Sequence, residues 1–158
     1  MTKPIPEGYN TVSPYLAVDD AAAAIEYYKQ AFGAEETMRM KGPDGKVGHA
    51  ELKIGDSHVM LSDPFPQAST SPPKELGGTT GSIFMYVEDV DSVVQQAVDA
   101  GGTVTMEVQD MFWGDRFGSV TDPFGHTWSI ATHVEDVPPE EMEERGKAAM
   151  AAMAAPGN

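Results

Sequence analysis

Two side chains that can move a proton, His49 and Glu51, stand two residues apart in the run from Gly48 to Gly55. In a β-strand, alternate residues point to the same face of the sheet. Imidazole titrates near neutral pH, and a neighbouring carboxylate can select its tautomer. His49 and Glu51 are therefore the candidate catalytic residues, and no other pair in the sequence suggests proton transfer.

A glycine-flanked loop over residues 110–118 holds Trp113 and Arg116. An indole can stack on a planar ligand, and a guanidinium can hold a carboxylate or a phosphonate through two parallel hydrogen bonds. In the structural alternative, the guanidinium locks the loop by pairing with one of three aspartates: Asp63, Asp115 or Asp122. The sequence leaves both interpretations open.

Several kinds of chemistry have no residues to perform them. The chain has no cysteine, which excludes a disulfide framework, thiolate metal ligands and a cysteine nucleophile. It also has no glycine-rich phosphate loop, nucleophile elbow or dinucleotide fingerprint. If the protein is an enzyme, these absences favour a lyase, an isomerase or a transferase.

The elements that position these residues come from an internal repeat. Residues 12–20 and 81–89 are both short β-rich runs that end in an acidic pair, and they are offset by 69 residues. Each run leads into an apolar stripe that predicts a helix, over residues 20–32 and 89–100, and each stripe is followed by a glycine.

Two more strands are predicted in each half. Residues 48–55 align with 118–125, and residues 57–62 align with 127–132, at an offset of about 70. Each half therefore has the pattern β-α-β-β-β.

We predict a single domain over residues 1–137, with modules at about 10–62 and 81–134. Prolines and glycines fill the connector at 63–80, and this composition predicts neither strand nor helix there. The tail at 138–158 opens with two prolines and two glutamates and predicts a terminal helix.

Several segments, taken in their order, resemble the vicinal oxygen chelate superfamily of glyoxalases, bleomycin-resistance proteins and extradiol dioxygenases. They are Tyr15–Asp20, Ala24–Ala34, Leu61–Asp63, Trp113–Gly118 and Asp122–Trp128. The match looks strongest to a branch associated with phosphonate operons. The resemblance covers residues 10–134 and implies an α+β fold whose two modules curl their sheets around a cleft, often in a homodimer.

In metal-dependent members of this superfamily, each module supplies one ligand from its first strand and one from its last. The positions that match here are Ser13, Met60, Ser82 and Ser129. Three hydroxyls and a thioether are too weak a donor set for a divalent ion, so we predict no standard metal site and no cofactor. A displaced divalent-metal site built from His49, Glu51 and either His58 or His133 stays an alternative.

If the three serines at these positions face the cleft, strand alternation places Tyr15, Phe84 and Tyr86 there as well. Rings with scattered hydroxyls are typical of a small-molecule pocket, although they can also simply fill a core. The predicted ligand-binding residues are Ser13, Tyr15, Met60, Ser62, Ser82, Phe84, Trp113, Arg116 and Ser129.

Acidic residues outnumber basic ones by 25 to 10, and the formal charge of −15 argues against binding to nucleic acid or to anionic membranes. No apolar run has membrane-spanning length, and no secretory signal is recognisable, so a cytoplasmic location is expected.

We expect a metal-independent, homodimeric small-molecule-binding protein. The alternatives are a metal-dependent lyase or isomerase of the glyoxalase type with displaced ligands, and a regulatory protein that uses its methionine-rich tail.

Overall fold

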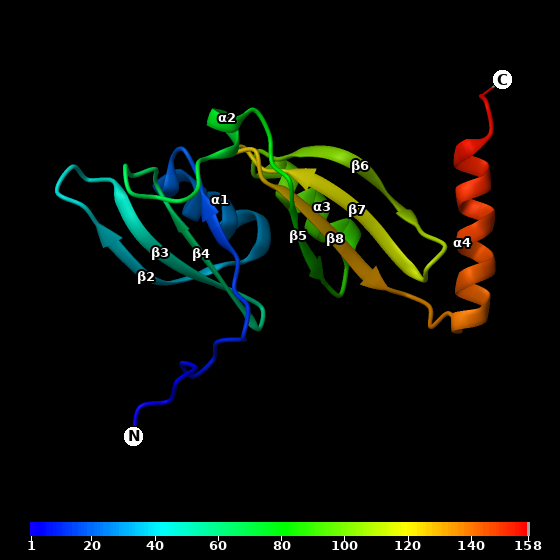
Figure 1. Ribbon diagram of the computed structural model, residues 1–158, viewed down its shortest axis with the longest axis horizontal. Coiled ribbons are helices and arrows are strands. Elements are labelled where there is room, and N and C mark those ends of the chain that lie inside the picture. Colours follow the sequence, from blue (N-terminus) through cyan, green and yellow to red (C-terminus); the bar gives the residue numbers. More distant parts are fainter. Residues whose placement is uncertain (158) are drawn as a thin grey trace.

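The computed structural model describes residues 1–157 and contains two modules of the predicted type (Figure 1). The first comprises β1 (Tyr15–Ala17), α1 (Ala21–Phe32), β2 (Glu35–Lys41), β3 (Val47–Ile54) and β4 (Ser57–Ser62). The second comprises β5 (Ser82–Tyr86), α3 (Val90–Asp99), β6 (Thr103–Asp110), β7 (Asp115–Thr121) and β8 (Thr127–His133). A terminal helix, α4 (Pro139–Ala154), follows. The α+β class, the paired modules and the C-terminal helix are confirmed.

Each module forms its own four-stranded mixed sheet, in the orders β1-β4-β3-β2 and β5-β8-β7-β6. In each sheet the first and last strands of the module run parallel, and the other neighbours run antiparallel. The cross-strand pair of Tyr15 with Met60 corresponds to the pair of Phe84 with Ser129. The first and last strands therefore both repeat at the predicted offset of 69 residues.

The predicted alignment of the third and fourth strands needs a correction. Ala50 pairs with Leu61, and Gly118 pairs with Ile130, so the third strands repeat at an offset of 68 residues. The last strands repeat one residue earlier than predicted and the third strands two residues earlier. The turn between β7 and β8 is longer than the turn between β3 and β4, and similar motifs slide past structurally equivalent positions.

Local side chains explain where the long helices begin and end. Asp20 caps α1 by accepting a hydrogen bond from the Ala23 amide at 3.0 Å, and Asp89 caps α3 through the Ser92 amide at 3.2 Å. Gly33 ends α1 in the left-handed conformation, with φ of 65°. These boundaries match the predicted helices.

The connector is not wholly irregular, as had been predicted. A single turn of helix, α2 (Pro73–Leu76), lies within it and ends at Gly77. Proline at the start of a helix removes an amide that would have no partner in any case, so the proline-rich composition still allows one turn.

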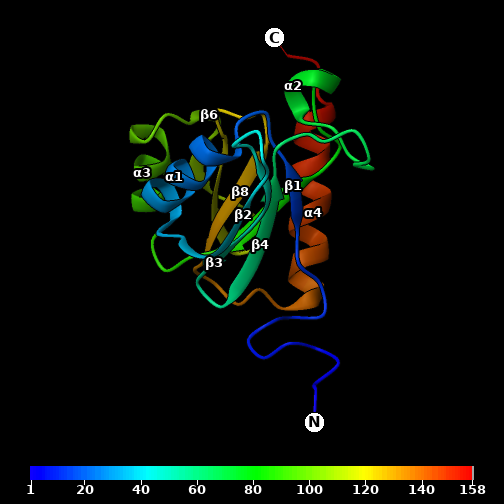
Figure 2. The same ribbon diagram turned by 90° about the vertical axis from the view of Figure 1, so that its left-hand side faces the viewer.

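The core lies where α1 and α3 pack against each other and against one face of the sheets. Figure 2 shows both helices on one side of the sheets and α4 on the other. The Tyr27 hydroxyl, on α1, donates a 3.0 Å hydrogen bond to the carbonyl of Ala97, on α3. The shared core joins the two modules through their helices.

The opposite faces of the sheets, here called the open faces, are not covered by these helices. Large apolar side chains are exposed there: Tyr15, Met38 and Met40 on the first sheet, and Phe84 and Tyr86 on the second. Tyr86 keeps 64% of its surface exposed. Exposed apolar patches of this kind are typical of binding surfaces.

Within residues 1–157, no helix combines the length and the apolar character needed to cross a membrane.

Candidate functional site

The predicted pair His49 and Glu51 is in contact on the open face of the first sheet. His49 Nε2 lies 3.0 Å from a Glu51 carboxylate oxygen, and His49 Nδ1 lies 2.9 Å from the Tyr15 hydroxyl. If Nε2 carries the proton and donates to Glu51, Nδ1 can accept from Tyr15. The shared face was predicted correctly, and the contact links a carboxylate, an imidazole and a phenol in one chain.

Two further side chains complete this cluster, and the sequence reasoning missed Tyr9. The Tyr9 phenol donates a hydrogen bond to Glu51, and the Tyr9 ring stacks on His58 with ring centroids 3.9 Å apart. Hydrogen bonds from His49 and Tyr9 hold the pKa of Glu51 below its usual value, so the carboxylate stays ionised. The hydrogen bond to Glu51 also raises the pKa of Tyr9, which keeps the phenol protonated.

The open face of the second sheet carries a row of aromatic rings. The Phe84 centroid lies 5.2 Å from that of Tyr86 and 5.7 Å from that of Phe117, and Trp113 lies 6.0 Å from Phe117. We call these four residues the aromatic wall. Their separations are those of interacting rings, so the wall is one continuous apolar surface.

One buried carboxylate, that of Asp115, holds the wall in place. Its side chain is 3% exposed and accepts hydrogen bonds from the Tyr86 hydroxyl at 2.9 Å and the Trp113 indole at 3.0 Å. His133 Nδ1 lies 2.8 Å from the same carboxylate. Burial pushes the pKa of Asp115 up, but the three hydrogen bonds outweigh burial and hold it below the usual value. The sequence reasoning did not single out Asp115 as a site residue, because its partners come from three separate segments.

Arg116 lies on the other side of the second sheet. Its neighbours Asp115 and Phe117 belong to the open face, so strand alternation turns Arg116 toward α3. There the guanidinium makes two hydrogen bonds to Asp91, at 2.7 and 2.9 Å, and one to Asp110 at 3.2 Å. It pairs with aspartates, as in the structural alternative, although not with the three that were named.

The four positions carried over for metal ligands divide between the two sheets. Met60 sits beside Tyr15 on the first, and the Ser129 hydroxyl lies 3.5 Å from that of Ser82 on the second. In the part of the chain that the structure describes, no three His, Asp or Glu side chains gather in a way that could hold a metal ion. The donor set of hydroxyls and a thioether does not fit the metal that the resemblance implies.

The remaining predicted ligand residues differ in how accessible they are. Ser62 is 3% exposed, so a ligand could reach it only after a rearrangement, whereas Ser13 is half-buried. Tyr15 and Ser82 line one groove of about 520 Å³ that runs beneath the connector between β1 and β5. The structure brings these two predicted residues to a common surface.

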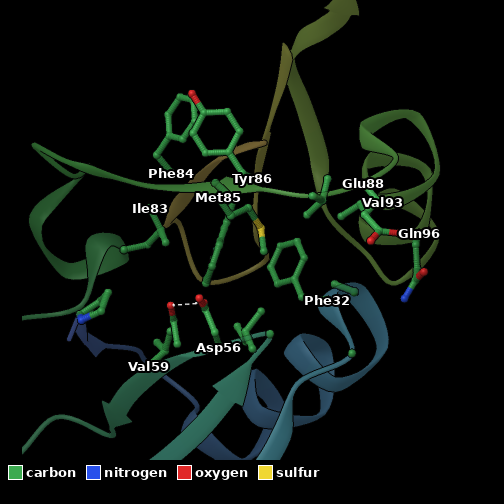
Figure 3. A pocket seen from close by; sticks show the side chains of 18 of the residues that line it. Phe32, Asp56, Val59, Ile83, Phe84, Met85, Tyr86, Glu88, Val93 and Gln96 are labelled. Carbon is green, nitrogen blue, oxygen red and sulfur yellow. Dashed lines mark hydrogen bonds between the residues drawn. The ribbon is translucent and has the colours of Figure 1, made fainter. Parts of the chain in front are cut away.

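The largest cavity of the chain lies elsewhere, on the helix side of β5 (Figure 3). It has a volume of about 720 Å³ and is lined by apolar residues such as Phe32, Ile83 and Met85. In Figure 3, Met85 points toward Phe32, while Phe84 and Tyr86 extend from the opposite side of the strand. Strand β5 therefore separates this cavity from the aromatic wall.

Comparison with known proteins adds to this picture. A model of the Glyoxalase/Bleomycin resistance protein/Dioxygenase superfamily matches residues 9–130. An uncharacterized protein of Mycobacterium bovis is 47% identical over 135 residues, which cover 84% of this chain and 89% of that protein.

Two solved structures are also similar. The crystal structure of TioX from Micromonospora sp. ML1 aligns with a TM-score of 0.64 and 28% identity, over 79% of this chain and 99% of that one. A gene product of Arabidopsis thaliana aligns with the same TM-score of 0.64 and 30% identity, over 78% of this chain and 98% of that one.

Proposed function

Since the chain belongs to the glyoxalase/bleomycin resistance protein/dioxygenase superfamily, we propose that it binds a small planar molecule on the open faces of its sheets, without a metal ion. The observation that carries the proposal is the aromatic wall held by Asp115. Three donors on one buried carboxylate fix the orientation of the rings before any ligand arrives. Preorganised rings lose little conformational freedom on binding, which favours affinity.

The ligand chemistry follows from the composition of the wall. Phe84, Tyr86, Phe117 and Trp113 offer stacking surfaces, and the hydroxyls of Ser82 and Ser129 offer a few polar contacts. A flat, largely apolar molecule with one or two polar substituents fits this combination.

The proposal includes a homodimer. Exposed apolar side chains on both open faces would be buried if the first sheet of one copy faced the second sheet of another. This pairing would also place the chain of Tyr15, His49 and Glu51 opposite the partner's aromatic wall and close a cleft around the ligand.

The dimer is tested by size-exclusion chromatography with light scattering. We expect twice the 16.9 kDa mass of the chain. Met40→Asp, which puts a charge on the open face of the first sheet, should shift the protein toward the monomer. A wild-type mass of one chain at micromolar concentration would contradict this part of the proposal.

Ligand binding is tested by isothermal titration calorimetry with 2-naphthol as the planar probe. Phe84→Ala should weaken binding by about tenfold, because it removes a central ring of the wall. Met85→Ala is the matched control, since Met85 is the next residue of β5 and points into the cavity on the other side. Equal effects of the two substitutions, or no saturable binding by the wild type, would count against the aromatic wall as the site.

A second candidate function, a lyase or isomerase of the glyoxalase type, is favoured by the contact of Glu51 with His49 and of His49 with Tyr15. The carboxylate can orient the imidazole, and the phenol can carry a proton toward a ligand. His49→Ala should abolish turnover if the protein is an enzyme and should only weaken binding if it is not.

The cytoplasmic location and a place in the phosphonate-operon branch also remain proposals. The absence of cysteine supports the first, and the motifs of residues 15–34 and 113–128 support the second.

A further inference from the structure

The imidazole of His58 is a buried polar group without a complete set of partners. The residue is 8% exposed, and within residues 1–157 its Nδ1 is a buried side-chain atom with no hydrogen-bond partner. Such an atom loses its contact with water and gains nothing in return, which is unfavourable by about 1–3 kcal/mol. Unsatisfied groups of this kind are rare, and they are frequently found where a ligand or water binds.

What covers His58 is the side chain of Tyr9. The two rings are nearly parallel, with an interplanar angle of 14° and centroids 3.9 Å apart, and the Tyr9 hydroxyl donates to Glu51. Gly8, with φ of 84°, allows the chain to turn so that it also passes close to His58. Tyr9 thus makes the contacts expected of a bound phenol: one ring face on an imidazole and one hydroxyl on a carboxylate.

The segment that carries Tyr9 is weakly attached. Residues 1–14 form no helix or strand, and most of them are exposed. Among the described residues, the hydrogen bond of Tyr9 to Glu51 is the only one that ties residues 1–13 to later parts of the chain. Releasing the segment therefore breaks one hydrogen bond and one ring stack.

We propose that Tyr9 occupies a subsite for a neutral planar molecule with a hydroxyl group, of the phenol class, and that such a ligand displaces the N-terminal segment. The stack on His58 selects a flat ring. Glu51 selects a hydroxyl donor and repels a carboxylate or another anion. When Tyr9 leaves, His58 Nδ1 gains access to water or to a polar group of the ligand. The inference rests on the proposed function in that both place a planar molecule on the open faces.

The test uses 4-methylphenol, which is the tyrosine side chain without its backbone, and the full chain with Tyr9→Ala. Calorimetry measures affinity, and the NMR signals of the His58 ring report the location. We expect 4-methylphenol to bind Tyr9→Ala at least about tenfold more tightly than wild type, because the competing ring is gone. Tyr9→Phe, which keeps the stack but loses the hydroxyl, should lie between the two. Ile5→Ala, in the same exposed segment, is the matched control and should behave as wild type.

Selectivity is tested with 4-methylanisole, which has the same ring but no donor. Tyr9→Ala should prefer the phenol, and this preference should shrink when Glu51→Gln is added. Equal affinity of wild type and Tyr9→Ala for 4-methylphenol would overturn the proposal, as would binding that leaves the His58 signals unchanged.

The outcome is separable from that of the aromatic wall, which lies on the other sheet. Adding Phe84→Ala to Tyr9→Ala should leave 4-methylphenol binding intact. The Tyr9 subsite can therefore be confirmed even if 2-naphthol fails to bind the wall, and it can fail while the wall is confirmed.

Discussion

The Tyr28 hydroxyl, on α1 of the first module, donates a 2.6 Å hydrogen bond to the buried carboxylate of Asp122, in the turn between β7 and β8 of the second. The same carboxylate accepts hydrogen bonds from the Trp128 indole at 2.9 Å and from two backbone amides of its own turn. Burial, together with the charge of Asp122, raises the pKa of Tyr28 well above its usual value, so the phenol remains a donor. One carboxylate thus joins the two modules and shapes a turn.

Replacing Asp122 should destabilise the fold strongly. Asp122→Ala leaves a buried phenol, a buried indole and two amides without their acceptor, and we expect a loss of about 3 kcal/mol or more in the free energy of unfolding. Tyr28→Phe removes one donor only and should lose about 1.5 kcal/mol. Urea unfolding measures both. Asp56→Ala, an exposed aspartate in the corresponding turn of the first module, is the control and should stay within about 0.5 kcal/mol of wild type. A similar loss for Asp56→Ala would contradict this explanation.

The contribution of His133 should depend on pH. Its Nε2 lies 2.8 Å from Asp136 and its Nδ1 lies 2.8 Å from Asp115, and only the charged ring can donate from both nitrogens. Hydrogen bonds to Asp136 and then to Asp115 raise the pKa of His133 above 6.5.

A raised pKa in the folded state means that His133 stabilises the protein fully below about pH 6.5, the value for the unfolded chain, and that this stabilisation is lost as the pH rises through the folded value. The lowered pKa of Asp115 has the opposite sign, and its contribution is lost in acid. The difference in unfolding free energy between wild type and His133→Gln should therefore be largest at about pH 5–6 and shrink toward pH 9. A difference that grows with pH would show that the assigned charge state is wrong.

Arg116 should matter for α3 rather than for ligand binding. Its guanidinium is held by Asp91, beside the start of α3, and by Asp110, on the side of the sheet away from the wall. Arg116→Gln should leave the affinity for 2-naphthol within about twofold of wild type, since exposed ion pairs act over short distances. A large loss of affinity would return Arg116 to the ligand-binding set, where the sequence had placed it as one of two alternatives.

The terminal helix should be dispensable for stability. No residue of α4 is buried, and its main ties are Arg145 to Glu135 and to the Phe112 carbonyl, with Gly146 close to the Phe112 ring. Ending the chain after Val137 should change the free energy of unfolding by less than about 1 kcal/mol. The same truncated protein on size-exclusion chromatography shows whether α4 contributes to association. A large loss of stability in a monomeric sample would mean that α4 packs more firmly than its exposure indicates.

The sequence by itself determined what depends on neighbouring residues. The aspartate caps, the glycine stop of α1 and the shared face of His49 and Glu51 all follow from helix or strand geometry over a few residues, and all were predicted. The duplicated pattern was strong enough to identify both modules, although unequal turn lengths shifted the alignment of the later strands.

The tertiary structure alone decided which distant groups meet. Tyr9 reaches Glu51 across 42 positions of the chain, Tyr28 reaches Asp122 across 94, and Arg116 chose Asp91 among many carboxylates. Such pairs depend on the angle and register at which whole elements dock, and an acidic chain offers many partners of similar chemistry. Only packing, which permits one arrangement of the helices and sheets, selects among them.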